Sequence, residues 1–322
     1  MKQLKTLLKT MAPSGAEDAR RAVIESLAAP FADEVITDTL GNLIVHKKGA
    51  GEKVLLSAHM DTIGMIATRV EDGFVRFGAL GGLSVLDLQN IPVRFENGVE
   101  GVLSYDGKTP VKDRKLHHCF IDIGDASVAV GDRAVFSGDL RTLGKNKICA
   151  PYLDNTLGCA ILLEVLQALK ETEYDLYFVF TVQEEVGLRG AKTAAFAIEP
   201  KFAIAVDVTD TGDLPETEVV METKLGGGAA IKVMDQSIVC HPKLVRALKD
   251  VAEKNGIPYQ SEVLTAGGCD AGAIHLSRGG VITGGVSVPV RYVHSPCETA
   301  DLRDVKAAVE LLVCALEQAA LS

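Results

Sequence analysis

Two short apolar runs constrain the fold of this chain more than any other feature. LYFVFTV (176–182) and FAIAVDV (202–208) have the length of strands and are almost entirely apolar. Such runs are typical of strands in a parallel sheet, because helices cover both faces of the sheet. AKTAAFAI (191–198) lies between them and favours a crossover helix, while VLLSAH (54–59) is another apolar run that ends in polar residues. The pattern predicts an α/β domain.

Helical periodicity supports this alternation of helices and strands. An apolar stripe follows Asp154 and Asn155, which are both good residues for a helix N-terminus. Further stripes predict helices around residues 244–251 and 305–316, and a short amphipathic helix at residues 4–11. The first stripe consists of Leu157, Ile161, Leu162, Val165 and Leu169.

The middle of the chain has a different residue pattern. VEDGFVRF (70–77) and VRFENGVEGVLS (93–104) place Asp-Gly and Asn-Gly steps between β-rich runs, and such steps form tight hairpin turns. No sustained helical period occurs there. We therefore expect an all-β domain at residues 64–151, inserted into an α/β domain that is built from residues 1–63 and 152–322. The α/β domain should contain a mixed sheet flanked by helices.

Charge and cysteine content exclude some classes of function. The chain of 322 residues has 33 basic and 43 acidic residues and a net charge of −10. This balance argues against a general binder of nucleic acids or membrane surfaces, since both are polyanionic. Seven cysteines without a C-x-x-C pair favour reduced thiols. No apolar run could span a bilayer, and lysines interrupt the N-terminal segment where a signal peptide needs an apolar core, so we expect a cytoplasmic protein.

Acidic and imidazole side chains gather where the predicted strands end. In open α/β sheets, ligands bind beyond the carboxyl ends of the strands. One further acidic residue stands at a predicted helix start. The residues concerned are His59, Asp61, Asp154, Glu184, Glu185, Asp207 and His294.

A metal site explains this pattern. Histidine and carboxylate ligands suit zinc, cobalt or manganese, and two ions need about six protein ligands with one carboxylate shared between them. Three carboxylates and a bridging hydroxide would balance two divalent ions. Asp61 lies on the same strand face as His59 and could accept the second imidazole N–H. If Asp154 bridges, the ligand set is His59, Asp154, Glu185, Asp207 and His294.

Two neighbouring residues offer a division of roles. Glu184 and Glu185 leave a strand together, and adjacent residues of a strand point in different directions. One can therefore bind metal while the other faces a bound water, as a general base must. The same adjacency counts against a glycosidase, whose two carboxylates flank one sugar bond at about 5–9.5 Å.

Five segments resemble the signature segments of the tetrahedral metallo-aminopeptidases. This is the family of glutamyl and deblocking aminopeptidases, some of which were once labelled endoglucanases. The match is collinear from SGAE (14–17) to His294, so it covers most of the chain. The segments are SAHMDTIG (57–64), YLDNTLG (152–158), TVQEEVGLRGA (181–191), AVDV (205–208) and RYVHSPCE (291–298).

The resemblance implies a dinuclear aminopeptidase that removes N-terminal residues from peptides with a free amine. It implies that His59 and Asp207 bind one ion and that Glu185 and His294 bind the other. Asp154 would be the bridge. From the residues alone, Asp154 could equally be a helix cap, and only the resemblance decides between the two roles.

The resemblance also implies catalytic roles and an assembly. Glu184 would be the general base that takes a proton from water and delivers it to the leaving amine, and Asp61 would support the metal-bound histidine. The two divalent ions would be zinc or cobalt, with manganese also compatible. The inserted β domain would mediate dimerisation, and the dimers would assemble into a hollow dodecamer.

Three positions depart from the family pattern. Thr62 stands where relatives often carry Glu, Thr156 where many carry Arg, and Cys269 where Thr is usual. None of these residues replaces a predicted metal ligand. The departures therefore bear on substrate preference and on the residues that surround the metal ligands. The sequence does not set the preferred N-terminal residue, although the net acidity weakly favours basic peptides.

Other interpretations stay open at this stage. A carboxypeptidase or N-acyl-amino-acid amidohydrolase could use the same dinuclear core. A glycoside hydrolase and a non-catalytic scaffold stabilised by metal are more distant alternatives. Outside the motif set, His117 and His118 are expected to point apart on a strand, and Cys269 to be a small packing residue.

Overall fold

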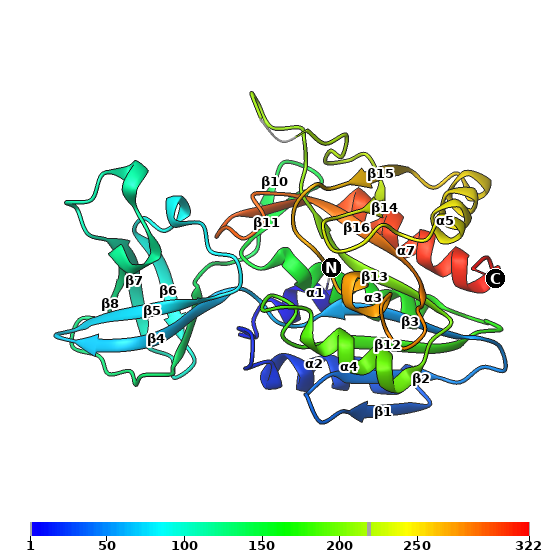
Figure 1. Ribbon diagram of the computed structural model, residues 1–322, viewed down its shortest axis with the longest axis horizontal. Coiled ribbons are helices and arrows are strands. Elements are labelled where there is room, and N and C mark those ends of the chain that lie inside the picture. Colours follow the sequence, from blue (N-terminus) through cyan, green and yellow to red (C-terminus); the bar gives the residue numbers. More distant parts are fainter. Residues whose placement is uncertain (1, 218–219, 322) are drawn as a thin grey trace.

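The computed structural model describes residues 2–217 and 220–321, and its strands form two units (Figure 1). The larger unit is an α/β body around an eleven-stranded mixed sheet. The smaller unit is a closed barrel of six antiparallel strands, which Figure 1 shows to one side of the body. The expected fold class is therefore confirmed: a mixed sheet flanked by helices, with a separate all-β unit.

The sheet of the body has a parallel centre and antiparallel edges. In order across the sheet, its main path consists of β1 (Glu34–Thr37), β2 (Leu43–Lys47), β12 (Asp175–Thr181), β3 (Lys53–His59), β13 (Phe202–Thr209), β16 (Ile282–Arg291), β17 (Glu298–Asp301), β11 (Lys147–Ala150) and β10 (Arg141–Leu143). Off this path, β14 (Ala229–Met234) pairs with β16 and with β15 (Tyr259–Val263). The apolar runs predicted as strands are β3, β12 and β13, and these pair in parallel.

Helices cover both faces of this sheet. Side chains alternate along the central strands: Leu56 and Ile204 belong to the core that α3 covers, whereas Leu55 and Ala203 belong to the core under α4. The predicted crossover helix is α4, which links β12 to β13. The helices are α1 (Lys2–Leu7), α2 (Asp18–Ala28), α3 (Leu153–Ala168), α4 (Arg189–Ile198), α5 (Pro242–Asn255), α6 (Ala271–Ile274) and α7 (Leu302–Glu317), with short 3-10 helices at Ala29–Phe31, Val85–Asp87, Val111–Asp113 and Leu116–His118.

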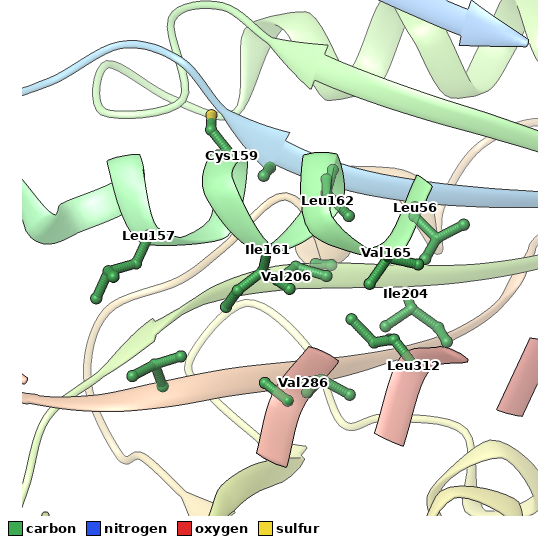
Figure 2. Close-up of a cluster of buried hydrophobic side chains, with 14 of the residues drawn as sticks. Leu56, Leu157, Cys159, Ile161, Leu162, Val165, Ile204, Val206, Val286 and Leu312 are labelled. Atoms are coloured by element: carbon green, nitrogen blue, oxygen red, sulfur yellow. The ribbon is translucent and has the colours of Figure 1, made fainter. Parts of the chain in front are cut away.

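The largest apolar core lies between α3 and the sheet. Figure 2 shows Ile161 and Val165 of α3 pointing toward Ile204 and Val206 of β13, with Leu312 of α7 beside them. These side chains are at most 1% exposed. In the described part of the chain, no helix combines the length and the apolar character needed to cross a bilayer.

The barrel forms from the region with hairpin chemistry. At the predicted Asp-Gly turn, Asp72 has a φ of 50° and Gly73 a φ of 79°, so both turn residues take the positive φ of a primed hairpin turn. Val75, Leu103 and Ile121 are fully buried in the barrel core. Its strands are β4 (Gly64–Glu71), β5 (Phe74–Leu80), β6 (Ile91–Phe95), β7 (Glu100–Tyr105), β8 (Cys119–Asp122) and β9 (Arg133–Phe136).

The sheets do not divide at the expected boundary, residue 151. The last barrel strand ends at Phe136, and β10 and β11 instead extend the sheet of the body by pairing with each other and with β17. Turn signals mark strands in a sequence but do not say which sheet those strands join, because pairing is set by distant partners.

The expectation for the paired histidines was wrong. His117 and His118 lie in the short 3-10 helix Leu116–His118, and their ring centroids are 4.0 Å apart. A 3-10 helix has about three residues per turn. Consecutive side chains therefore do not alternate between opposite faces as they do on a strand, and these two rings touch.

We expect Leu56→Ala to lower the free energy of unfolding by about 2–5 kcal/mol, because Leu56 is fully buried against α3 and the vacated space cannot collapse completely. Urea unfolding of chelator-treated protein measures this change. Leu276→Ala is the matched control, since Leu276 is 72% exposed and its loss should change the stability by less than about 0.5 kcal/mol. Equal effects of the two substitutions would contradict this account of the core.

Candidate metal centre

The structure brings all five predicted ligands together. The Nε2 atom of His59 lies 3.1 Å from Oδ1 of Asp154 and 3.6 Å from Oδ1 of Asp207. The Nε2 atom of His294 lies 3.3 Å from Oδ2 of Asp154 and 3.3 Å from Oε2 of Glu185. Asp154 therefore presents one oxygen to each histidine and occupies the middle of the cluster.

The parallel register of the sheet explains why these residues meet. Thr181 of β12 pairs with His59 of β3, and Ala205 of β13 pairs with Ser57. Two residues beyond Ala205, Asp207 comes level with His59. His294 follows β16, the next strand, and has a φ of 64°. Four neighbouring strands thus deliver side chains to one edge of the sheet, as the sequence predicted.

Asp154 and Asn155 have non-helical backbone angles near the start of α3, and Asn155, not Asp154, caps the regular helix that follows. The Oδ1 atom of Asn155 accepts a hydrogen bond from the backbone N–H of Gly158 at 2.8 Å, and its amide donates to the backbone oxygen of Val206 at 2.8 Å. Because Asn155 satisfies the helix terminus, the carboxylate of Asp154 is free to face the two histidines.

The two neighbouring glutamates diverge as expected. The Oε2 atom of Glu185 faces His294, whereas Oε2 of Glu184 lies 4.0 Å from Nε2 of His59. Asp61 fixes both residues, since its carboxylate accepts the backbone N–H of Glu184 at 2.9 Å and that of Glu185 at 3.2 Å. The hydroxyl of Ser14 donates a third hydrogen bond to it at 2.6 Å.

The orientation of His59 differs in detail from the prediction. Its Nδ1 atom lies 3.0 Å from the backbone oxygen of Asp61 and 3.6 Å from the carboxylate Oδ1 of the same residue. The backbone oxygen is therefore the nearer partner of Nδ1. With Nδ1 engaged there, Nε2 is the nitrogen that faces the centre.

Glu298 is a residue of the centre that sequence reasoning missed. It is 1% exposed, and its carboxylate accepts the backbone N–H of Asp154 at 2.8 Å and that of His294 at 2.9 Å. One buried side chain thus holds two of the predicted ligands in place. Its position at the end of RYVHSPCE was the only signal in the sequence, because a bond to the backbone leaves no residue pattern.

Negative charge dominates the electrostatics of the centre. Burial lowers the pKa of His59, but Glu184 and Asp207 outweigh this effect and raise it well above its usual value. Burial also lowers the pKa of His294, yet Asp154 and Glu185 raise it to about 12. The centre therefore favours bound positive charge.

Burial increases the pKa values of three carboxylates of the centre, whereas the pKa of Asp154 is lowered, since its contacts with His294 and His59 outweigh the effect of burial. Burial raises the pKa of Glu184 well above its usual value, and the charges of Asp207 and Glu185 add to this rise while His59 opposes it. Burial likewise raises the pKa of Asp207. Carboxylates forced together in this way are stabilised by cations.

The unpartnered oxygens fit metal ligands. Within the described part of the chain, Oε1 of Glu185 is buried without a hydrogen-bond partner, and Oδ1 of Asp154 lies beside His59 outside hydrogen-bond geometry. Ligand atoms of His59, Asp154 and Glu185 lie within 4.8 Å of one another, and so do those of His59, Glu184 and Asp207. Histidine and carboxylate donors at this spacing suit divalent zinc, cobalt or manganese.

A cavity of about 460 Å³ opens onto the centre. One wall carries the residues described above, and the remaining wall is largely apolar or made of glycine. Gly82, in the segment that follows barrel strand β5, approaches so closely that an added Cβ would lie 2.8 Å from Nδ1 of His294. Only glycine therefore fits there without displacing this histidine.

The three departures from the family pattern are all buried. The hydroxyl of Thr62 donates to the backbone oxygen of Ala12 at 3.3 Å. The hydroxyl of Thr156 has no hydrogen-bond partner among the described residues. Cys269 is 1% exposed, and its thiol donates to Oδ2 of Asp235 at 3.1 Å. Burial raises the pKa of this thiol well above its usual value. Cys269 is thus an unreactive interior residue with one hydrogen bond.

Comparison with known proteins points to one family. Residues 41–311 match the family described as M42 glutamyl aminopeptidase. A protein from Acetivibrio thermocellus named as a putative aminopeptidase is 50% identical over 309 residues, which cover 93% of each chain.

Solved structures agree with this match. An aminopeptidase from the archaeon Desulfurococcus kamchatkensis is 36% identical, with a TM-score of 0.95 over 98% of this chain and 94% of that one. The TET1 peptidase of Pyrococcus horikoshii, described as assembling into a tetrahedron or a large octahedral shell, is 33% identical. Its TM-score is 0.88 over 98% of both chains.

We expect Glu298→Gln to weaken the binding of Zn²⁺ or Co²⁺ by about 10–100-fold, because an amide cannot accept both backbone N–H groups that the carboxylate accepts. Titration against a competing chelator measures this affinity. Glu25→Gln, on the exposed face of α2, is the control and should leave it unchanged. Wild-type affinity in the Glu298 variant would show that this residue does not hold the ligands.

Proposed function

Because the chain belongs to the M42 glutamyl aminopeptidase family, we propose that it removes the N-terminal residue from peptides with a centre of two divalent metal ions. That the chain is a peptide hydrolase of the aminopeptidase type follows from the family itself. The observation that carries the dinuclear proposal is the placement of Asp154, which offers one carboxylate oxygen to the side of His59 and the other to the side of His294.

The donor set divides into two halves around this carboxylate. His59 and Asp207 would hold one ion, Glu185 and His294 would hold the other, and Asp154 would be shared. Glu184 also lies near His59, but its 4.0 Å distance exceeds the 3.1 Å of Asp154, so we leave it outside the ligand set. The bound ions would polarise the scissile carbonyl and lower the pKa of a water molecule. Zinc or cobalt is our first choice, and manganese is compatible with the same donors.

Glu184 is the proposed general base. It lines the cavity beside the ligands, Asp61 holds its backbone, and burial raises the pKa of its carboxylate. A carboxylate with an increased pKa accepts a proton from water more readily at neutral pH. In the proposed reaction Glu184 takes that proton and then delivers it to the leaving amine, so the amine departs in its neutral form.

The family match and the free cysteines also support a proposed assembly and compartment. The shells described for the TET1 peptidase favour a homo-oligomer, and we propose that the barrel mediates dimerisation and that dimers build a dodecamer. Phe74 of β5 is 45% exposed and Val102 of β7 is 46% exposed, so the barrel offers apolar surface for such contacts. All seven cysteines are free, which fits the reducing cytoplasm.

Replacement of Glu184 by Gln should reduce kcat by about 10²–10⁴-fold and leave metal content unchanged, because an amide cannot carry the proton but retains the shape of the side chain. Hydrolysis of leucyl anilide and the metal content per subunit are the two measurements. Glu171→Gln, at an exposed position, serves as the control. Near wild-type turnover would exclude Glu184 as the base, and loss of metal would make it a ligand.

A free α-amine should be required for turnover. We expect chelator-treated protein to hydrolyse leucyl anilide only after Zn²⁺, Co²⁺ or Mn²⁺ is restored, and to leave N-acetyl-leucyl anilide intact throughout. Release of the anilide chromophore measures both reactions. Preferential cleavage of the acetylated substrate would favour an N-acyl-amino-acid amidohydrolase instead.

A further inference from the structure

Apart from the proposed ligands and Glu184, the wall of the cavity carries one charged side chain. This part of the wall combines apolar residues and glycines with one threonine and a single carboxylate. Among the residues that the structure describes, neither lysine nor arginine lines the cavity. The residues of this wall are Gly82, Gly187, Leu188, Val208, Thr209, Asp210, Leu264, Gly267, Gly268 and Val293.

Asp210 is the charged residue of this wall, and the metal centre does not use it. It directly follows β13, three residues after the predicted ligand Asp207, and is partly buried. Within the described ranges, no side chain pairs with its carboxylate. It lines the same cavity as the predicted ligands. Burial raises the pKa of its carboxyl group, the charge of His294 lowers it and the charge of Asp154 raises it. A desolvated carboxylate without a partner is stabilised by an incoming cation.

The basic residue at the end of the strand next to β13 is already occupied. Arg291, at the end of β16, donates two hydrogen bonds to Asp213, one at 2.9 Å and one at 2.7 Å. Its guanidinium is therefore committed to another carboxylate and does not neutralise Asp210. The negative charge of Asp210 remains available to the contents of the cavity.

These features favour one class of substrate side chain. A glutamyl or aspartyl side chain would lose its hydration, find no cation on this wall and face the carboxylate of Asp210. A lysyl or arginyl side chain could lay its methylene groups against Leu188 and Leu264 and place its charge near Asp210. A neutral apolar side chain would gain the apolar contacts alone.

We propose that Asp210 makes this enzyme select peptides with a basic N-terminal residue. The inference rests on the proposed aminopeptidase function and names its substrate class. It is opposite to the glutamyl preference in the description of the family. The selection acts on the side chain of the N-terminal residue and not on its α-amine.

Three anilides separate these alternatives: lysyl, leucyl and glutamyl, each assayed with metal-loaded protein. We expect kcat/KM of the wild type to be at least tenfold higher for the lysyl than for the glutamyl substrate. Asp210→Asn should lower kcat/KM for the lysyl anilide about 10–100-fold, the usual range for a lost hydrogen bond to a charged group. It should change turnover of the leucyl anilide less than about threefold, which also shows that the variant is folded.

Two further variants complete the experiment. Asp210→Lys should shift the ratio of glutamyl to lysyl turnover at least tenfold toward the glutamyl substrate. Asp250→Asn, on the exposed surface of α5, removes the same charge elsewhere and should change none of the three rates.

The outcomes distinguish this inference from the function on which it rests. Wild-type protein that cleaves leucyl anilide without preferring lysyl over glutamyl anilide overturns the role of Asp210 and leaves the aminopeptidase intact. An equal loss on all three substrates in Asp210→Asn also overturns it, since the residue would then bind the α-amine or support the fold. Failure of metal-loaded wild type to cleave any aminoacyl anilide overturns the proposed function together with the inference.

Discussion

Repulsion between carboxylates in one partly enclosed space is the constraint on which this structure depends. Asp154, Glu184, Glu185 and Asp207 face the cavity together with only two histidines. Their burial raises the pKa values of Glu184, Glu185 and Asp207, so the fold holds groups together that would separate in water. The chain achieves this by anchoring the backbone: Asp61 accepts N–H groups of both glutamates, and Glu298 accepts those of Asp154 and His294. Divalent cations would then stabilise the arrangement that these anchors prepare.

The sequence predicted the parts of this arrangement that follow from strand pattern. Apolar runs identified β12 and β13, and the rule that parallel strands end at one edge placed His59, Asp207 and His294 together. The anchors were harder to foresee. Glu298 accepts hydrogen bonds from backbone N–H groups. Asn155 caps the helix in place of Asp154, because Asp154 faces the histidines. Such bonds depend on tertiary positions that no residue spacing records.

The barrel shows a second limit of prediction from sequence. Hairpin signals located its strands, but β11 pairs with β17 in the C-terminal part of the chain and β10 pairs with β11. The division between the two sheets therefore lies before β10, at an earlier position than expected.

The barrel also contributes to the metal centre. Gly82 follows β5 and lies against His294, so the segment that leaves a barrel strand forms part of the cavity wall. An arrangement of barrel and body that shifted this segment would alter the space around a predicted ligand.

Charge balance explains how one carboxylate outside the centre can govern substrate choice. In the proposed dinuclear centre, two divalent ions would offset the charge of Asp154, Glu184, Glu185 and Asp207, so the combined field of these four carboxylates would be largely cancelled. Asp210 has no such compensation, because Arg291 is bound to Asp213 and no other basic side chain lines the cavity in the described residues. Its charge therefore dominates the wall that a substrate side chain would contact, and partial burial limits screening by salt. The metal ions would determine which bond is cleaved, whereas Asp210 would determine which N-terminal residue is accepted.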